Sequence, residues 1–467
     1  MNRPEAKLPA SQRAVPPAKW WGRYETDGNP PRPRFVVRWG RILSAALALV
    51  LTGYLSLMTA LWGYYAIDRR IPGVNWLDVV VLPRFSRVQN AIGSHYFEQA
   101  KDLWKAKDYV RALFTARAAV GKAPANLDAR LFLAGCWRAA GRPEEAVRVL
   151  RGGIAYNAGD ARLQQTIVGT CLDTERYQDL LKALREEFPA YGVTLLDAGH
   201  PAFQLAELRA LLEMGDAAGA EALASAEPGL QENPAAAPLL AQVDWDLGRH
   251  DAAFARLARA RERDPADAGV QDSYVEFAFR TGRTAEAHSA ARQFLDRNPT
   301  LVAAQVRFLE VFGSRKGSDL NLWVGVFMRF MAQNRHSADA LAQLGTLAAS
   351  EGWTDVAYLL YQNSLEERLN GFPFAIYYAG SLVKAGDLSA ADEVWHELSI
   401  RNSAQLASAS YIGAMVAWGN GRVSDALQIV DQLRTETASD LHRRRTIETL
   451  FHTFGFAAIA DELAKQK

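Results

Sequence analysis

The chain has 467 residues, of which 53 are Lys or Arg, 52 are Asp or Glu and only two are cysteine. Two cysteines exclude a disulfide-stapled scaffold and a cluster of zinc ribbons, and a net charge of +1 argues against a dedicated nucleic-acid binder. With 49% hydrophobic residues, the chain is long enough for several domains or for one long array, because single cores stop growing near about 250–300 residues.

The charge is unevenly distributed along the chain. Residues 1–41 hold nine Lys or Arg and three acidic residues, so this segment carries +6 and the remainder carries 1 − 6 = −5. The segment also contains seven prolines and almost no apolar periodicity, so it cannot bury enough surface to offset the entropy lost on ordering. We therefore predict that residues 1–41 form a disordered, basic, proline-rich tail.

The next segment, residues 42–67, contains no charged side chain. As a helix its 26 residues would be about 39 Å long, and a bilayer core of about 30 Å needs only about 20 residues. A cleaved signal peptide fits less well, because its apolar part is usually about 7–15 residues long and is followed by small residues. Here the carboxyl end of the apolar segment carries the bulky residues Trp62, Tyr64 and Tyr65. We predict a retained transmembrane helix over 42–67, followed by a linker over 68–92.

Flanking charges predict the orientation of this single span. The tail carries nine Lys or Arg, whereas the first 20 residues after the span carry four, and positive charge stays on the cytoplasmic side of a membrane. We therefore expect an inner-membrane protein with a cytoplasmic amino terminus and an extracytoplasmic body. Counted over 20 residues on each side the difference is five against four, so the opposite topology stays open as the alternative.

Small residues recur at every fourth position of the predicted span. Close approach of two backbones along such a stripe is the usual basis of helix association in membranes. The stripe therefore suggests packing of the span against itself or another anchor, although Ala and Ser are common throughout the chain. Its members are Ser44, Ala48, Thr52, Ser56 and Ala60.

Beyond the linker, the sequence repeats itself with a period of about 34 residues. A turn glycine is followed five residues later by an alanine, and helical apolar periodicity flanks each such pair. Two longer steps, of 74 and 70 residues, each contain one degenerate copy, near 161–200 and 302–337. The pairs are Gly141/Ala146, Gly215/Ala220, Gly248/Ala253, Gly282/Ala287, Gly352/Ala357, Gly386/Ala391, Gly421/Ala426 and Gly455/Ala460.

Each copy reads as helix, turn, helix. The glycine suits the left-handed residue that ends the first helix, and the small alanine lets the second helix approach it closely. This pattern resembles the tetratricopeptide repeat family, of a membrane-anchored bacterial type. The resemblance implies an all-α fold in which about eleven hairpins over residues 93–467 form a right-handed superhelical solenoid.

The family's register places the first helix of each hairpin on a concave surface that binds extended peptides or partner proteins. The tryptophans and arginines at these positions are typical binding anchors, although they also suit packing between repeats. The resemblance places the following residues on the groove: Phe97, Lys101, Trp104, Lys105, Arg138, Gln242, Trp245, Glu276, Phe279, Arg280, Tyr411, Met415 and Trp418.

Signals for chemistry are poor. The eight histidines show no metal-ligand spacing, and there is neither a glycine-rich phosphate loop nor a nucleophile elbow. Cys136 and Cys171 lie on predicted first helices of neighbouring copies, where we expect buried free thiols, although their redox state is not fixed by the sequence. We expect no cofactor, no metal and no nucleic-acid partner.

Three functions remain, in descending order of support. The first is a non-enzymatic, membrane-anchored scaffold whose solenoid binds other proteins in envelope assembly, secretion or export. The second is an adaptor whose repeats face the cytoplasm. The third is an α/α-toroid enzyme that cleaves polysaccharides with paired carboxylates, such as Asp272 and Glu276. The glycine and alanine register favours an open superhelix over a closed ring. The partner, the pathway, the oligomeric state and the role of the degenerate copies are not readable from the sequence.

Overall fold

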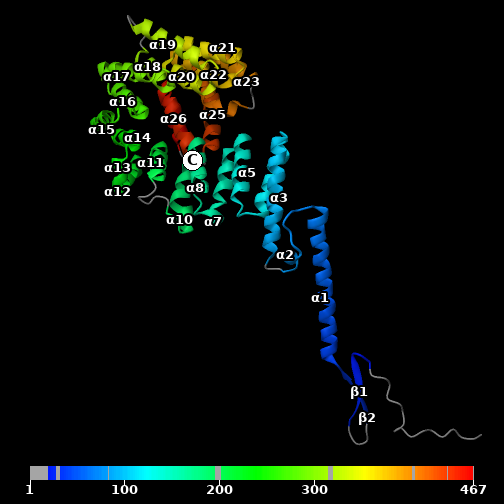
Figure 1. The fold of residues 1–467 in the computed structure, drawn as a ribbon. Coiled ribbons are helices and arrows are strands. Elements are labelled where there is room, and N and C mark those ends of the chain that lie inside the picture. The colour runs from blue at the N-terminus through cyan, green and yellow to red at the C-terminus, as the bar shows by residue number, and fades with distance from the viewer. Residues whose placement is uncertain are drawn as a thin grey trace, which may run out of the picture. The chain divides into compact units, whose positions relative to one another are not determined.

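The computed structural model describes residues 19–27, 32–81, 84–194, 201–313, 319–401, 405–438 and 440–465. It divides into two compact units, Met1–Thr166 and Ile167–Lys467, with the boundary inside one helix. Over the described residues the chain is helical apart from one short β hairpin near the amino end (Figure 1).

The β hairpin lies within the segment for which the sequence predicts disorder. Strand β1 (Gly22–Asp27) pairs antiparallel with β2 (Arg32–Val37), and Gly22 stands opposite Val37. Aromatic and β-branched residues in this stretch favour extended backbone, which a count of prolines and charges overlooks. A two-stranded hairpin alone is marginal in water. Residues 1–18 and 28–31 of the predicted tail lie outside the described residues.

Helix α1 (Trp39–Gly63) continues through the π turn η2 (Tyr64–Asp68), so the predicted span is helical from end to end. Among the described residues, this helix is the one that is long and apolar enough to cross a membrane, and none of its side chains is buried. A short helix, α2 (Trp76–Val80), follows within the predicted linker.

In the part of the chain that the structure describes, eleven consecutive helix pairs follow. They are α3 (Phe85–Lys105) with α4 (Tyr109–Lys122), α5 (Leu127–Ala139) with α6 (Pro143–Arg151), α8 (Ala161–Asp173) with α9 (Tyr177–Lys182), α11 (Pro201–Glu213) with α12 (Ala217–Ala226), α14 (Ala237–Asp246) with α15 (His250–Arg263), α16 (Ala268–Arg280) with α17 (Thr284–Arg297), α18 (Val302–Val311) with α19 (Asp319–Asn334), α20 (Ala338–Glu351) with α21 (Thr354–Glu366), α22 (Gly371–Ala385) with α23 (Leu388–Arg401), α24 (Ser410–Gly419) with α25 (Val423–Glu436), and α26 (Leu441–Phe454) with α27 (Ala457–Ala464). Short turns connect or extend them: α7 (Ile154–Asn157), η4 (Ala183–Glu187), α10 (Phe188–Ala190), α13 (Pro228–Glu232), η5 (Pro234–Ala236) and η6 (Leu406–Ala409).

The turn between paired helices has the geometry that the sequence predicts. All eight turn glycines have positive φ, from 67° at Gly215 to 90° at Gly455, a conformation that a Cβ would disfavour. The eight alanines that follow are at most 2% exposed, because each lies where the second helix meets the first. In the first pair, Lys107 takes the same left-handed conformation with φ of 63°.

The two degenerate copies are also helix pairs, but their second helices are irregular or their turns are altered. In the third pair, α9 passes into the π segment η4, and residues 195–200 of this degenerate copy lie outside the described residues. In the seventh pair, residues 314–318, between α18 and α19, also lie outside them.

In the second unit, the last pair returns to the first part of the array. The His442 ring lies edge-on to Tyr177 with centroids 4.6 Å apart, and its Nδ1 donates to the Glu213 carbonyl oxygen at 3.0 Å. The guanidinium of Arg445 lies where a Cβ on Gly215 would stand. Figure 1 shows α26, in red, returning to the green start of this unit. The sequence predicts an open superhelix, whereas here the ends of the second unit touch.

Small residues on first helices explain how the array curves this tightly. A Cβ on Gly380 of α22 would stand 3.5 Å from the Phe454 ring of α26, although another pair lies between these helices in sequence. Lys384 of α22 also donates to the Thr453 carbonyl. Because α22 and α26 approach so closely, the inner side of the last three pairs is filled with side chains.

Candidate functional site

The predicted groove residues of the first unit form an aromatic cluster between α3 and α5. The Phe97 ring packs edge-on against Phe132 at 5.8 Å between centroids, and Trp104 packs against Phe132 at 5.9 Å. The Lys101 ammonium lies 4.6 Å from the centre of the Phe97 ring. Lys105 and Arg138 are exposed at the edges of this cluster. Phe97 and Trp104 therefore pack between the first two helix pairs and also form part of the surface there.

In the second unit, the predicted groove residues of α14 and α16 come together on one surface. The Arg280 guanidinium stacks over the Trp245 ring at 4.5 Å from its centre, and Arg280 also donates to Glu276 at 3.3 Å. Gln242 donates to Asp246 one turn further along α14. We call this surface, with its continuation on α18, the charged face; it comprises Gln242, Trp245, Asp246, Asp272, Glu276, Phe279, Arg280, Arg307 and Glu310.

Arg307 of α18 is the centre of the charged face. Its guanidinium lies 2.8 Å from Asp272 and 2.9 Å from Glu276, both on α16, and 2.7 Å from Glu310 on its own helix. Three carboxylates around one largely buried guanidinium tie α16 to α18 through charge-assisted hydrogen bonds. The arrangement fixes the side chains of two neighbouring first helices before any partner arrives.

Burial and charge act in opposite directions on these groups. Burial alone would lower the pKa of Arg307, but the hydrogen bond to Asp272 and the three nearby carboxylates raise it above its ordinary value. Burial raises the pKa of Glu310, while Arg307 opposes that shift. Burial likewise raises the pKa of Asp246, opposed by its bond from Gln242 and by Arg280. The face is thus a preorganised set of paired charges at the boundary of solvent.

A recess extends the charged face onto α20. Asp272, Arg307 and Glu310 line one side of it, and Gln343, Thr346 and Ser350 lie along the other. Its volume is about 300 Å³. A recess that crosses three successive first helices can accept an extended segment, whose side chains would meet carboxylates, a guanidinium and hydroxyl groups in turn.

The structure overturns the groove assignment of Met415 in the tenth pair. Met415 is fully buried in the core formed with α22, α25 and α26, and Tyr411 and Trp418 pack against the same core. Burial raises the pKa of the Tyr411 hydroxyl to about 12. The close approach of α22 and α26 leaves no open surface at Met415, which is a packing residue, whereas Tyr411 and Trp418 are half-buried beside it.

Sequence reasoning missed Arg307 and Glu310 because they lie in a degenerate copy, where the turn signal is lost. Their repeat position was nonetheless readable. Arg307 follows Glu276 by 31 residues and Asp272 by 35, close to one period, which places it on the neighbouring first helix. Opposite charges one period apart on first helices predict contacts between adjacent repeats.

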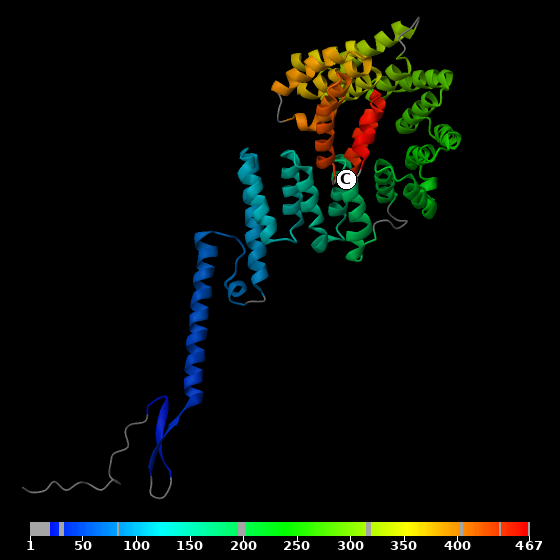
Figure 2. The ribbon, with the colours of Figure 1, turned by 180° about the vertical axis from the view of Figure 1, so that it is seen from behind.

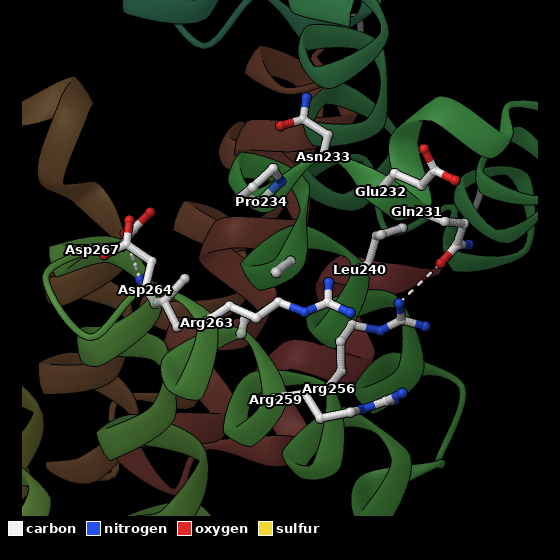
Figure 3. Close-up of a pocket in the computed structure, with 13 residues that line it drawn as sticks. Gln231, Glu232, Asn233, Pro234, Leu240, Arg256, Arg259, Arg263, Asp264 and Asp267 are labelled. Carbon is white, nitrogen blue, oxygen red and sulfur yellow. Dashed lines mark hydrogen bonds between the residues drawn. The ribbon is translucent and has the colours of Figure 1, made fainter.

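A second recess lies beside α15, on the other helix of the fifth pair. Arg256, Arg259 and Arg263 line it from α15, and Asp264 and Asp267 lie at the Arg263 end (Figure 3). Arg256 is held by Gln231 at 3.0 Å and by Asp244 at 3.0 Å. With a volume of about 330 Å³ and charges of both signs, this recess suits a polar group better than a small apolar ligand.

Groups suited to metal binding are not brought together anywhere in the part of the chain that the structure describes. Cys136 and Cys171 are both buried thiols with no disulfide between them, and burial raises the pKa of the Cys136 thiol to about 11. In α1, the stripe residues from Ser44 to Ala60 are exposed in the single chain, so their surface is free for packing.

Comparison with known families gives a match over a short part of the chain. Residues 103–167 match the family model of the tetratricopeptide repeat. These residues run from the end of α3 through the second pair into α8. They include the turn residues Lys107 and Gly141, both of which have positive φ. Among curated proteins, none matches the sequence.

Solved structures with similar helical arrays are distant in sequence. The Naa15/Naa10 complex bound to HypK-THB is 13% identical over 89% of this chain and 68% of that chain, with a TM-score of 0.33. A tetratricopeptide repeat protein from Parabacteroides merdae is 14% identical over 54% and 97%, with a TM-score of 0.39. PilF from Pseudomonas aeruginosa is 12% identical over 52% and 92%, with a TM-score of 0.28.

Proposed function

We propose that the chain is a tetratricopeptide repeat protein, because residues 103–167 match that family's model and the described helices form successive hairpins, and that it is a membrane-tethered, non-enzymatic scaffold that binds an extended segment of a partner protein on the charged face. The observation that carries this proposal is the continuity of that face across α14, α16 and α18, with the recess beyond it on α20. Trp245 and Arg280 supply an aromatic and a guanidinium anchor, which are the side chains that most often dominate binding energy at interfaces.

The chemistry of the face favours binding over catalysis. Asp272 and Glu276 are both hydrogen-bonded to the Arg307 guanidinium, so their oxygens are engaged by the same side chain and are not set apart as the two acids of a glycoside-cleaving pair. A partner segment with charges of alternating sign would match the order of acidic and basic groups across these helices.

Tethering rests on α1. Its bare apolar surface needs a non-aqueous environment, and the excess of basic residues before it favours a cytoplasmic amino terminus with the repeats outside. Scaffolds on that side of an inner membrane serve envelope assembly, secretion or export. The stripe Ser44, Ala48, Thr52, Ser56 and Ala60 offers a surface for pairing with a second span. The cytoplasm-facing adaptor is the alternative, and a reporter fused to the carboxyl end distinguishes the two.

Site-specific photo-crosslinking in intact cells tests the binding face. A photoreactive residue replaces Phe279, which is 37% exposed on the charged face, and a matched control replaces Phe114, which is exposed on a second helix, α4. We expect a discrete adduct from position 279 only, and its loss in the variant carrying Trp245→Ala and Arg280→Ala. Equal adducts at both positions, or an adduct that survives the double variant, would refute this face as the binding site.

A further inference from the structure

The chain that leaves α1 turns back along it. Trp62 Nε1 donates to the Val74 carbonyl at 3.2 Å, Trp76 Nε1 donates to Thr59 Oγ1 at 2.9 Å, and Tyr54 donates to the Val80 carbonyl. As the chain advances from Val74 to Val80, its contact therefore moves from Trp62 to Tyr54, which is eight residues, or about 12 Å, toward the amino end of α1. Both views show α2 beside the upper part of α1 (Figure 2).

This return covers one side of the last turns of the apolar run. Ile71, Val74 and Val79 form a buried core with Val88 and Ile92 of α3. The side chains of α1 that pack against this core are Met58, Leu61, Trp62 and Tyr65. The end of the predicted span thus has a protein environment on this side, in contrast to the turns before Tyr54.

The outer side of the returning segment is apolar. Trp76, Leu77 and Val81 are exposed, with Leu77 at 54%. The one acidic residue of α2, Asp78, is buried instead, where it accepts from Asn75 at 3.4 Å and faces Arg87 at 3.7 Å. An exposed apolar cluster without exposed acidic residues is the composition of a membrane-interface element.

Basic residues flank this segment in sequence. Exposed arginines precede and follow it: Arg69, Arg70, Arg84 and Arg87. One exposed acidic residue, Asp68, lies beside the first two in sequence. Guanidinium groups close to an apolar segment can bind the phosphates of anionic lipid headgroups. The occupant that fits this surface is therefore a lipid leaflet.

We propose that residues 71–81 form a foot that inserts Trp76, Leu77 and Val81 into the interface of the leaflet from which α1 emerges, and that the hydrocarbon core ends near Thr59. This inference rests on the proposed membrane anchor. The part of α1 left to cross the hydrocarbon, residues 42–58, has 17 residues and a length of about 26 Å, at the short end of what a bilayer accepts. The apolar run to Ile67 then continues above the membrane, stabilised by the core with α3.

Cysteine accessibility tests the foot in the full chain. The purified protein, with Cys136→Ala and Cys171→Ala, is reconstituted into liposomes of phosphatidylethanolamine and phosphatidylglycerol that are opened by freeze–thaw, so orientation does not matter. A membrane-impermeant maleimide then probes single cysteines at Val50, Ile67, Leu77 and Val110, all of which are at least 54% exposed in the protein itself.

The foot predicts an order of labelling rates that the hydropathy of the sequence does not predict. Position 77, in the linker predicted from sequence, should label at least about 10-fold more slowly than position 67, in the predicted span. The reason is that lipid covers position 77 and leaves position 67 open to water. Position 50 should be protected and position 110, on α4, should label fully.

The outcomes separate the foot from the anchor. If position 77 labels as fast as position 67 while position 50 stays protected, the foot is wrong and the anchor stands. If position 50 also labels, the anchor itself is wrong. Protection of position 77 that disappears when the lipid-to-protein ratio is raised would indicate contact between two copies, and would overturn insertion into lipid.

Discussion

Helices α1 and α22 are both strongly apolar, yet they differ in every contact. Among its 25 residues α1 has no buried side chain, whereas α22 buries eight of its 15. Leu49 in α1 is 75% exposed and Phe374 in α22 is 2% exposed. An apolar helix inside a repeat array finds its partners in neighbouring pairs, but α1 has none along most of its length. The lack of protein contacts along α1 therefore supports the proposed membrane span as much as its apolar composition does.

The largest expected effect comes from placing charge on α1. In the variant Leu49→Arg with Val50→Arg, each arginine at the centre of a span costs about 2.5–3.5 kcal/mol of insertion free energy, or roughly 6 kcal/mol for the pair. We expect the protein to leave the membrane pellet after carbonate extraction, while Leu49→Ala with Val50→Ala stays in it. If the double-arginine variant remains in the pellet, α1 is not a lipid-facing span.

The matching change in α22 should act on folding instead. Removing the Phe374 ring leaves a cavity in a packed core, which lowers the free energy of unfolding by about 3–5 kcal/mol. We expect a lower urea midpoint for Phe374→Ala by circular dichroism in lipid nanodiscs, and a change below about 0.5 kcal/mol for Leu49→Ala. Equal shifts for the two variants would remove the distinction between a protein-packed and a lipid-packed helix.

The solenoid accepts charge near its core where partners neutralise it, and Arg307 shows how. The variant Arg307→Met leaves Asp272, Glu276 and Glu310 close together without a cation, so it should lower the free energy of unfolding by about 2–4 kcal/mol at pH 7. Burial raises the pKa of Glu310, and its protonation relieves part of this repulsion, so the loss should shrink as the pH falls. Arg280→Met, at an exposed position, serves as the control. A loss that grows on acidification would contradict this role.

The turn chemistry of the repeats was readable from the sequence because it is local. A left-handed residue is required where the first helix ends, and a small side chain is required five residues later, so glycine and alanine recur in register whatever surrounds them. Positive φ at Gly282 and full burial of Ala287 are one instance. The helical character of the apolar segment follows in the same way from residues 42–67 alone.

Contacts between distant pairs could not be predicted in this way. The meeting of His442 with Tyr177 depends on small rotations summed over all the pairs between them, which no single repeat encodes. Burial of Met415 follows from the same curvature, because α26 returns toward α22 and fills the inner side there. Arg307 was missed for the opposite reason, since its copy lacks the local turn signal that sets the register.

The smallest expected effect is on the rate at which a maleimide labels a thiol that is covered by protein or by lipid. Burial raises the pKa of Cys136 from 9.0 to about 11, so at pH 8 its thiolate fraction, and with it the rate of maleimide labelling, should be about 100-fold below that of a free thiol. Urea should restore that rate in liposomes, because unfolding removes the protein around Cys136. A cysteine introduced by Leu49→Cys should stay unlabelled in the same urea, because the bilayer remains. If urea exposes both thiols together, α1 is covered by protein and resembles α22 after all.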